Sequence, residues 1–414
     1  MLDNTIHARG GLLLVLVAGL LAIGEQGQAE RTEAPDALTI DADYPGGNII
    51  VDKVTGDTVH LRQDLRDTRG WWFYWNFRVL GAAGRELTFA FSGRSPIGVR
   101  GPAISRDKGK SWQWLGRESV EGNVFTYCFP ESEGEVRFAF AMPYHRRHLD
   151  RFLKAHAGAS ETGRLSINTL CQSAQGRDVP LLSLKARSGT PRRRVLVTAR
   201  HHACETMANY VLEGFIHRWL SEDGPVNPPD DVEVMIVPLV DYDGVEDGDQ
   251  GKNRKPRDHN RDYDQGGIYP ETRAIRTLVE SWPARELKVA IDLHCPWIRG
   301  KHNEVIYMVG TANERIAAEQ ARFGKVLQAA CQGDLTYQVS DNLPFGTAWN
   351  TADNYKQGMS FSRWASERPG IRLATTFEIP YANAGGQPVT PASAHAFGQD
   401  LAAALVTYLR HDSS

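Results

Sequence analysis

The second half of the chain contains short runs made almost entirely of apolar residues: RRRVLVTA, DVEVMIVPLV, LKVAIDLH, EVIYMVG and LATTFEI. Such runs without strict alternation are typical of strands that are buried on both faces. Stretches such as MANYVLEGFIHRWLSE and ETRAIRTLVESW lie between them and predict helices. Strands that alternate with helices predict an α/β fold, here a mixed sheet flanked by helices. Binding sites are then expected at the carboxyl ends of the strands.

The preceding region, from about residue 36 to 145, has a different pattern. Alternating runs such as TVHLRQD, LTFAFSG and EVRFAFAM are broken by Gly, Pro, Asp and Ser. This pattern predicts an antiparallel β-sandwich domain over 36–145, followed by the α/β domain over 149–410. The aromatic cluster Trp71, Trp72, Tyr74 and Trp75 could stack on sugars. We favour the other interpretation, in which these rings are divided between the sandwich core and the contact with the next domain.

The first residues have the pattern of an export signal. Arg9 precedes an apolar stretch from Leu12 to Ile23, and small residues follow up to Ala29. The apolar stretch is shorter than the roughly 20 residues that span a bilayer, so cleavage after Ala29 is favoured over a retained anchor. We therefore expect a signal peptide at 1–29, a periplasmic or secreted protein, and no membrane attachment after the signal is removed.

Charge and cysteine content exclude some classes of protein. The formal net charge of −3 provides no broad basic field, so we expect no nucleic-acid partner. The cysteines number only 5, which is too few for a disulfide scaffold. Cys204 and Cys295 each lie beside a candidate metal ligand. They could be soft ligands, a disulfide or thiols of the core, and the last of these is the favoured interpretation.

The segment RHHACETMAN follows the first apolar run and is rich in metal-binding side chains. His202 and Glu205 are one helical turn apart, so both can point at the same spot. His294 ends the run LKVAIDLH, which places it at the carboxyl end of a strand. Two histidines and one glutamate, with a fourth position left for water, form a typical catalytic zinc site. Asp292 is a candidate partner for the ring of His294.

Two further groups suit the hydrolysis of an amide bond. Glu378 ends the run RLATTFEI, where an unliganded carboxylate can accept a proton from water and pass it to a leaving amine; a surface ion pair is the alternative. The polar loop DGDQGKNRKPRDHNRDYD offers Asn260 and Arg261 to bind a substrate carboxylate. A second arginine of this loop could stabilise the oxyanion.

In order, spacing and setting, these elements resemble the zinc metallocarboxypeptidases: His202-x-x-Glu205, Asp258-His-Asn260-Arg261, His294 at a strand end, and Glu378 in TTFEIPY. The amino-terminal region, ending in FAFAMPYHRRHLDRFL, resembles the sandwich that precedes the catalytic domain in the cytosolic-carboxypeptidase branch. The resemblance implies that His202, Glu205 and His294 bind one Zn²⁺ per chain. It also implies that Asn260 and Arg261 hold the terminal carboxylate and that Glu378 is the general base and acid.

The chain departs from the family pattern at one position. The carbonyl-polarising arginine usually lies ten positions before the arginine of Asn-Arg, and Gly251 stands there. Arg254 or Arg257 could replace it, and we prefer Arg254. Counting back from Glu378 places Tyr355 within one residue of the family's mobile tyrosine and Arg363 at the floor of the side-chain pocket. A basic floor would favour acidic carboxy-terminal residues.

The sequence therefore predicts an exported zinc metallocarboxypeptidase that hydrolyses the last residue of peptides with a free carboxylate. One alternative keeps the zinc site but acts on N-acyl amino acids or cell-wall peptides. Another is a peptide-binding protein without turnover, which the glycine at position 251 would favour.

Overall fold

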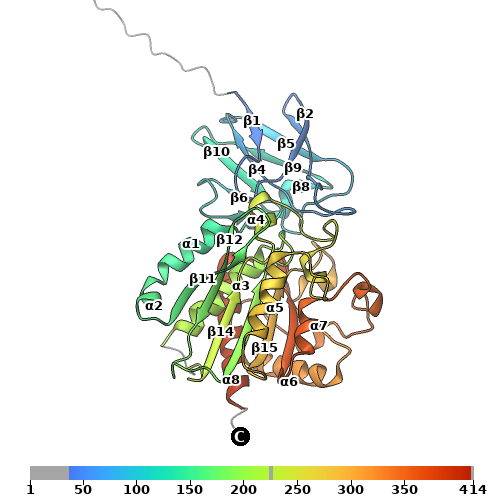
Figure 1. Ribbon diagram of the computed structural model, residues 1–414. Coiled ribbons are helices and arrows are strands. Elements are labelled where there is room, and N and C mark those ends of the chain that lie inside the picture. Colours follow the sequence, from blue (N-terminus) through green and yellow to red (C-terminus); the bar gives the residue numbers. More distant parts are fainter. Residues whose placement is uncertain (1–36, 223–226, 412–414) are drawn as a thin grey trace, which may run out of the picture. The chain divides into compact units, whose positions relative to one another are not determined.

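Residues 37–222 and 227–411 are described by the computed structural model, so the predicted signal peptide lies outside the described residues. Within these two ranges, no helix is both long enough and apolar enough to cross a membrane. Two β-sheets come first in the chain, and a larger mixed sheet with helices follows (Figure 1). This is the fold class that the sequence predicts. The exact domain boundaries stay a prediction.

The amino-terminal region consists of two five-stranded sheets. One has the order β1-β4-β10-β6-β7 and the other β2-β3-β5-β9-β8. The pairing is antiparallel, as alternation predicts, except that β3 pairs with β5 in parallel. The strands are β1 (Thr39–Asp41), β2 (Ile50–Thr55), β3 (Thr58–Arg62), β4 (Asn76–Leu80), β5 (Glu86–Phe91), β6 (Ala103–Ser105), β7 (Gln113–Trp114), β8 (Val120–Glu121), β9 (Val124–Cys128) and β10 (Glu135–Ala139).

Aromatic rings fill the space between these two sheets. Phe89 on β5 stacks on Phe125 with 4.8 Å between ring centroids, and Phe138 packs against both. Trp75 is fully buried beside Phe125, and its indole N–H donates to the carbonyl of Pro96 at 3.0 Å. Trp75 therefore belongs to the core, as expected for part of the aromatic cluster.

The α/β part is built on a seven-stranded sheet of order β11-β12-β14-β13-β15-β17-β16. Its four central strands run parallel, and β11, β12 and β16 pair antiparallel at the edges. The central strands are buried along nearly their whole length, which is why they read as continuous apolar runs. The strands are β11 (Leu165–Gln172), β12 (Asp178–Leu184), β13 (Arg193–Ala199), β14 (Val232–Val237), β15 (Leu287–His294), β16 (Tyr307–Val309) and β17 (Leu373–Glu378); a hairpin of β18 (Asn383–Ala384) and β19 (Gln387–Pro388) follows.

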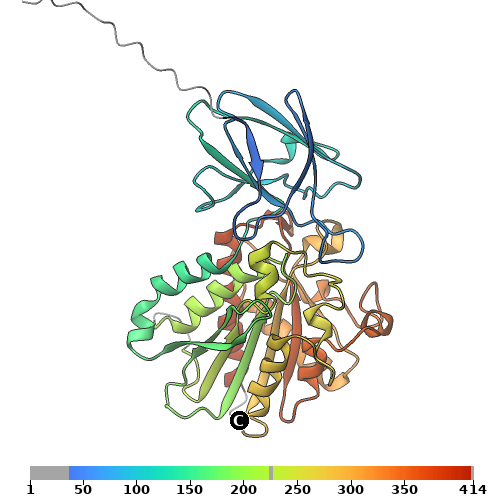
Figure 2. The same cartoon turned by 45° about the horizontal axis from the view of Figure 1, so that its top comes forward.

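Helices cover this sheet (Figure 2). They are α1 (Arg146–Ala155), α2 (Ala157–Glu161), α3 (Met207–Leu220), α4 (Tyr242–Asp247), α5 (Pro270–Glu280), α6 (Glu314–Ala330), α7 (Phe361–Ser366) and α8 (Pro391–Arg410). Short 3-10 turns lie at Arg117–Ser119, His259–Arg261, Lys301–Glu304, Val339–Asp341 and Ala352–Tyr355. Helices α3 and α8 cross closely, because a Cβ at Gly214 would lie 1.8 Å from the carbonyl oxygen of His395. Any larger residue there would force the two helices apart.

The loop between β3 and β4 links the sandwich to the α/β part. Trp71 and Trp72 pack against Trp297, with ring centroids 5.6 and 5.0 Å away. Gln250 accepts the N–H of Tyr74 at 2.8 Å and donates to its carbonyl at 2.9 Å. The aromatic cluster is thus divided between the core and this contact, as the sequence analysis favoured. The contact brings sandwich residues to the loop that contains Asn260 and Arg261.

Candidate metal centre and active site

A tight turn follows β13 and holds the first two candidate ligands. Arg200 begins the turn with a left-handed backbone (φ 64°), and its guanidinium is buried. That guanidinium donates to the carbonyls of Ala203 and Tyr144 and to the side chain of Asn209. Helix α3 begins only at Met207, so His202 and Glu205 lie in the turn and not in the helix. The N–H of Glu205 still donates to the carbonyl of His202 at 3.2 Å, which keeps the two side chains together.

His202, Glu205 and His294 converge at one point. The Nδ1 atoms of the two histidines are 3.1 Å apart. Oε1 of Glu205 lies 3.0 Å from Nδ1 of His202, and Oε2 lies 2.7 Å from Nδ1 of His294. These atoms come from the turn after β13 and from the end of β15, which are neighbours in the parallel sheet. The structure therefore brings together the three residues that sequence analysis proposed as ligands.

The chemistry of this cluster fits a zinc ion. The three residues form a group that could hold a metal, and all are buried. Oε2 of Glu205 is buried, and the ring nitrogen that lies 2.7 Å from it, Nδ1 of His294, is itself a candidate ligand. Burial opposes ionisation of Glu205, but His294, Lys252 and His202 hold its pKa well below the ordinary value. Two imidazole nitrogens and an ionised carboxylate are ligands that zinc prefers.

The outer nitrogen of each histidine faces an aspartate. Nε2 of His294 lies 2.6 Å from Oδ2 of Asp292, and Nε2 of His202 lies 3.5 Å from Oδ1 of Asp258. Asp292 also contacts His201 at 2.8 Å. Burial would raise the pKa of Asp292, but His201 and His294 hold it well below the ordinary value. An ionised aspartate at the outer nitrogen leaves the inner nitrogen free to bind a metal.

Asp292→Asn is expected to lower zinc affinity by about 10- to 100-fold, because the amide no longer fixes the ring of His294 as a carboxylate does. Competition with a chelating dye measures the affinity directly. Asp334→Asn changes an exposed aspartate in the same way and is the matched control. Equal affinity of the two variants would contradict the positioning role of Asp292.

Glu378 lies beside His294, on the neighbouring strand of the sheet. It ends β17 in register with His294 and is 5% exposed. Its Oε2 has no hydrogen-bond donor among the described residues. Burial raises the pKa of Glu378 to about 7, although the charges of Lys252 and His294 oppose this. A carboxylate with a pKa near neutrality can both accept and donate a proton, which is what a general base and acid must do.

A cavity of about 370 Å³ opens beside the cluster, and His202, His294 and Glu378 line it. Asn260, Arg261 and Tyr355 line the same cavity. The Asn260 side chain is fixed, since its Oδ1 accepts the N–H of Phe361 at 2.9 Å. The guanidinium of Arg261 lies 5.3 Å from the ring centroid of Tyr355. Asn260, Arg261 and Tyr355 therefore line the same cavity as the candidate metal ligands.

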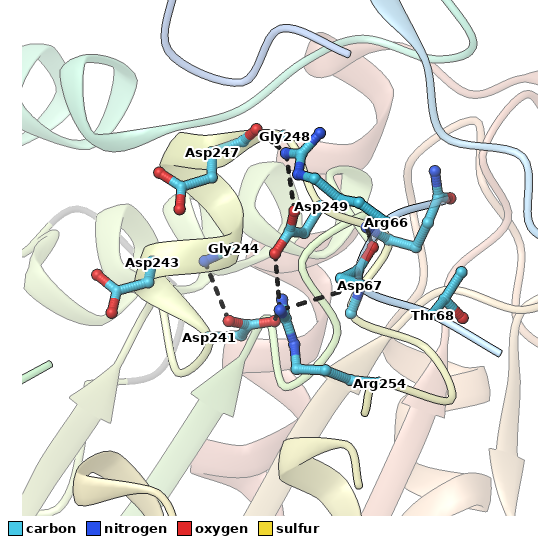
Figure 3. Close-up of polar contacts among 12 residues, drawn as sticks. Arg66, Asp67, Thr68, Asp241, Asp243, Gly244, Asp247, Gly248, Asp249 and Arg254 are labelled. Carbon is cyan, nitrogen blue, oxygen red and sulfur yellow. Dashed lines mark hydrogen bonds and ion pairs between the residues drawn. The ribbon is translucent and has the colours of Figure 1, made fainter. Parts of the chain in front are cut away.

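Arg254 does not line this cavity. Its guanidinium pairs with Asp249 at 2.6 Å and Asp241 at 2.5 Å, and it lies 3.8 Å from Asp67 of the sandwich loop (Figure 3). Its role in polarising a carbonyl stays a prediction, and the side chain is engaged elsewhere. Position 251 could not hold an arginine either, because Gly251 has φ 74° and a Cβ there would lie 2.2 Å from the backbone nitrogen of Ala203.

Arg363 is exposed and lines a second cavity of about 410 Å³. Val309, Tyr355, Ser360 and Ser362 line both cavities, so the two adjoin. Glu367 lies in the same wall as Arg363. The sequence analysis placed Arg363 at the floor of a pocket; the structure places it on an exposed wall.

Three residues at the centre were not predicted from the sequence. Lys252 lines the main cavity, and its Nζ lies 2.6 Å from Oε1 of Glu205. Trp72 of the sandwich loop lines the same cavity, and its ring centroid is 5.8 Å from this Nζ. His201 contacts Asp292 behind the ligands. His201 lies in RHHACE and Trp72 in the aromatic cluster, so both had a sequence signal. The positions of Lys252 and Trp72 at this site depend on contacts between distant segments. Cys204 and Cys295 are buried free thiols, the interpretation that was favoured for them.

Comparisons with known proteins agree with this centre. Residues 151–268 match the family model described as zinc carboxypeptidase. The chain is 29% identical over 161 residues to cytosolic carboxypeptidase 2 of Xenopus tropicalis, which covers 37% of this chain and 17% of that protein. It is 24% identical over 342 residues to cytosolic carboxypeptidase 6 of Caenorhabditis elegans, which covers 76% of this chain and 73% of that protein. The chain thus spans less than a fifth of the first relative's length.

A metallo-carboxypeptidase from Burkholderia cenocepacia has a similar structure, with a TM-score of 0.75, 21% identity, and coverage of 90% of this chain and 99% of that one. At this identity the likeness concerns the fold, which includes the β-sheets before the α/β part. The matched segment contains His202, Glu205, Asn260 and Arg261, and the sheet adds His294 beside them. Residues 151–268 therefore match the zinc carboxypeptidase family, and the chain has distant similarity to the cytosolic carboxypeptidases.

Proposed function

We propose that this protein is an exported metallocarboxypeptidase that binds one zinc per chain and releases the carboxy-terminal residue of peptides. The observation that carries this proposal is the arrangement of one cavity. His202, His294 and Glu378 line it, and the carboxylate-binding candidates Asn260 and Arg261 line the same space. A terminal carboxylate on Arg261 would bring the last peptide bond toward the metal centre.

Zinc supplies a Lewis acid that lowers the pKa of a bound water. Glu378 accepts a proton from the attacking water as its oxygen adds to the last peptide carbonyl. The same carboxyl then donates that proton to the leaving amine as the C–N bond breaks. The buried position of Glu378 and the rise in its pKa to about 7 support both steps.

Arg261 explains why cleavage would be confined to chain ends. Its guanidinium can bind a carboxylate through two N–H groups, and an internal peptide segment offers no such group. Amidation of the substrate's carboxy terminus is therefore expected to abolish most of the cleavage. The predicted export of the chain favours extracellular or cell-wall peptides as substrates.

A panel of peptides that differ only in the last residue tests the activity, with residues 30–414 as the protein and bound zinc measured in parallel. One zinc per chain and stepwise loss of terminal residues support the proposal. Zinc without cleavage of any free or amidated peptide would contradict it, and N-acyl amino acids would then be the next substrates to try.

A preference for acidic terminal residues is the finer prediction. Arg363 and Glu367 lie in one wall of the adjoining cavity, so they would act in opposite directions on a charged side chain placed there. We expect terminal Glu to be released faster than Leu or Lys, and Arg363→Gln to reduce that advantage. Glu367→Gln is the matched variant and should increase it. Because Arg363 is exposed, about tenfold is the expected scale, or roughly 1.4 kcal/mol. Equal or slower release of Glu would contradict the prediction.

A further inference from the structure

Lys252 is a cation at the centre of the site that the roles described above do not use. Its side chain is 17% exposed, and its Nζ lies 2.6 Å from Oε1 of Glu205. Of the described residues that line the main cavity, only Lys252 and Arg261 are lysine or arginine. Since Arg261 lies beside Asn260 and suits the terminal carboxylate, Lys252 is the cation left for the reacting end of the cavity.

The backbone around Lys252 is fixed by the sandwich loop. Asp67 accepts the N–H of Gln250 at 3.1 Å and the N–H of Gly251 at 2.9 Å. The hydroxyl of Thr68 donates to the carbonyl of Lys252. Figure 3 shows Asp67 and Thr68 near Arg254, which follows this segment in the chain. A lysine has a long flexible side chain, so a rigid backbone is what makes its ammonium a well-placed charge.

The three other candidates for supplying this charge are closed in the structure. Gly251 packs against the backbone of the metal-binding turn, with His202 Cα and Ala203 N within 2.9 Å of an ideal Cβ, so an arginine cannot stand at that position. Arg254 is paired with Asp241 and Asp249, and neither it nor Arg257 lines the cavity. Arg257 is instead paired with Asp262 and Asp264. Lys252, the residue directly after Gly251, enters the cavity instead.

We propose that Lys252 stabilises the oxyanion that forms when water adds to the substrate carbonyl, the role in which the family resemblance implies an arginine. This inference rests on the proposed carboxypeptidase activity. An ammonium group has three N–H donors, and Glu205 uses one of them, so donors remain for a substrate oxygen. A cation held in a buried cavity stabilises a developing negative charge more strongly than one in water.

The test compares Lys252→Met, Lys252→Gln and Lys252→Arg with Lys255→Met, which changes an exposed lysine of the same loop. Five quantities are measured for each variant: bound zinc, kcat, KM, the dissociation constant of the released amino acid, and that of a phosphonate peptide whose tetrahedral phosphorus carries an anionic oxygen. The constant for the amino acid reports on Asn260 and Arg261, which bind its carboxylate in the proposed function. The glutamine variant shows whether a loss seen in Lys252→Met comes from the missing charge or from poor packing of the methionine.

Lys252→Met and Lys252→Gln should keep one zinc and lower kcat by about 10²- to 10³-fold, with a similar loss of phosphonate affinity and little change in KM or amino-acid binding. Lys252→Arg should recover part of both losses, and Lys255→Met should match the wild type. Unchanged kcat and phosphonate affinity, or loss of zinc together with activity, would overturn the inference and leave Lys252 as a partner of Glu205. If zinc-loaded wild type cleaves no peptide, the proposed function itself fails.

Discussion

Glu378→Gln is expected to lower kcat for release of the terminal residue by about 10²- to 10⁴-fold. The amide cannot accept the proton of the attacking water or return it to the leaving amine. Glu378 is buried and lacks a hydrogen-bond donor among the described residues, so the substitution keeps the shape of the site and removes only the acid–base group. Single-turnover kinetics with a saturating peptide measure the effect on the chemical step.

Zinc content and KM should be nearly unchanged in this variant, because the ligand atoms belong to His202, Glu205 and His294. Glu280→Gln, which changes an exposed glutamate at the end of α5, is the matched control. If the protein binds peptides without turnover, Glu378→Gln would keep the peptide affinity and change no other measured property. Full activity of Glu378→Gln would exclude Glu378 as the base.

Arg254→Met is expected to lower the free energy of unfolding by about 3 kcal/mol or more. The substitution leaves Asp241 and Asp249 without the guanidinium that pairs with them, and the Asp241 side chain is only 3% exposed. The cluster also joins the sandwich loop to the α/β part through Asp67. Urea denaturation, followed by tryptophan fluorescence, measures the loss.

Arg69→Met provides the control, because Arg69 is exposed in the same sandwich loop and should change stability by no more than about 0.5 kcal/mol. This experiment also decides between two roles for Arg254. Substitution of a residue that polarises the substrate carbonyl would lower kcat in the folded enzyme without a large loss of stability. Substitution of a residue that holds the loop would instead lower stability and leave kcat of the folded enzyme nearly unchanged. This is the outcome expected from the ion pairs of Arg254.

The catalytic centre could be predicted from the sequence because its residues lie at the ends of apolar strands. A parallel sheet places the ends of β13, β15 and β17 side by side, so His202, His294 and Glu378 had to meet once those strands were recognised. The spacing of Glu205 from His202 brought in the third ligand. The sandwich was predictable for a similar reason, since alternating burial leaves a direct pattern in the sequence.

The choice among the cations of the loop could not be predicted in this way. Lys252, Arg254 and Arg257 lie within a few residues of one another, and their spacing does not reveal which one enters the cavity. That depends on Asp241 and Asp249, which hold Arg254, and on Asp67 and Thr68 from a loop far away in the sequence. The sequence by itself determined the candidate metal ligands, the candidate base and the order of the elements, because residue type and strand ends suffice for these. Only the tertiary structure decided which charged side chain of the loop lines the cavity, because long-range ion pairs and the close packing at Gly251 control where each side chain points.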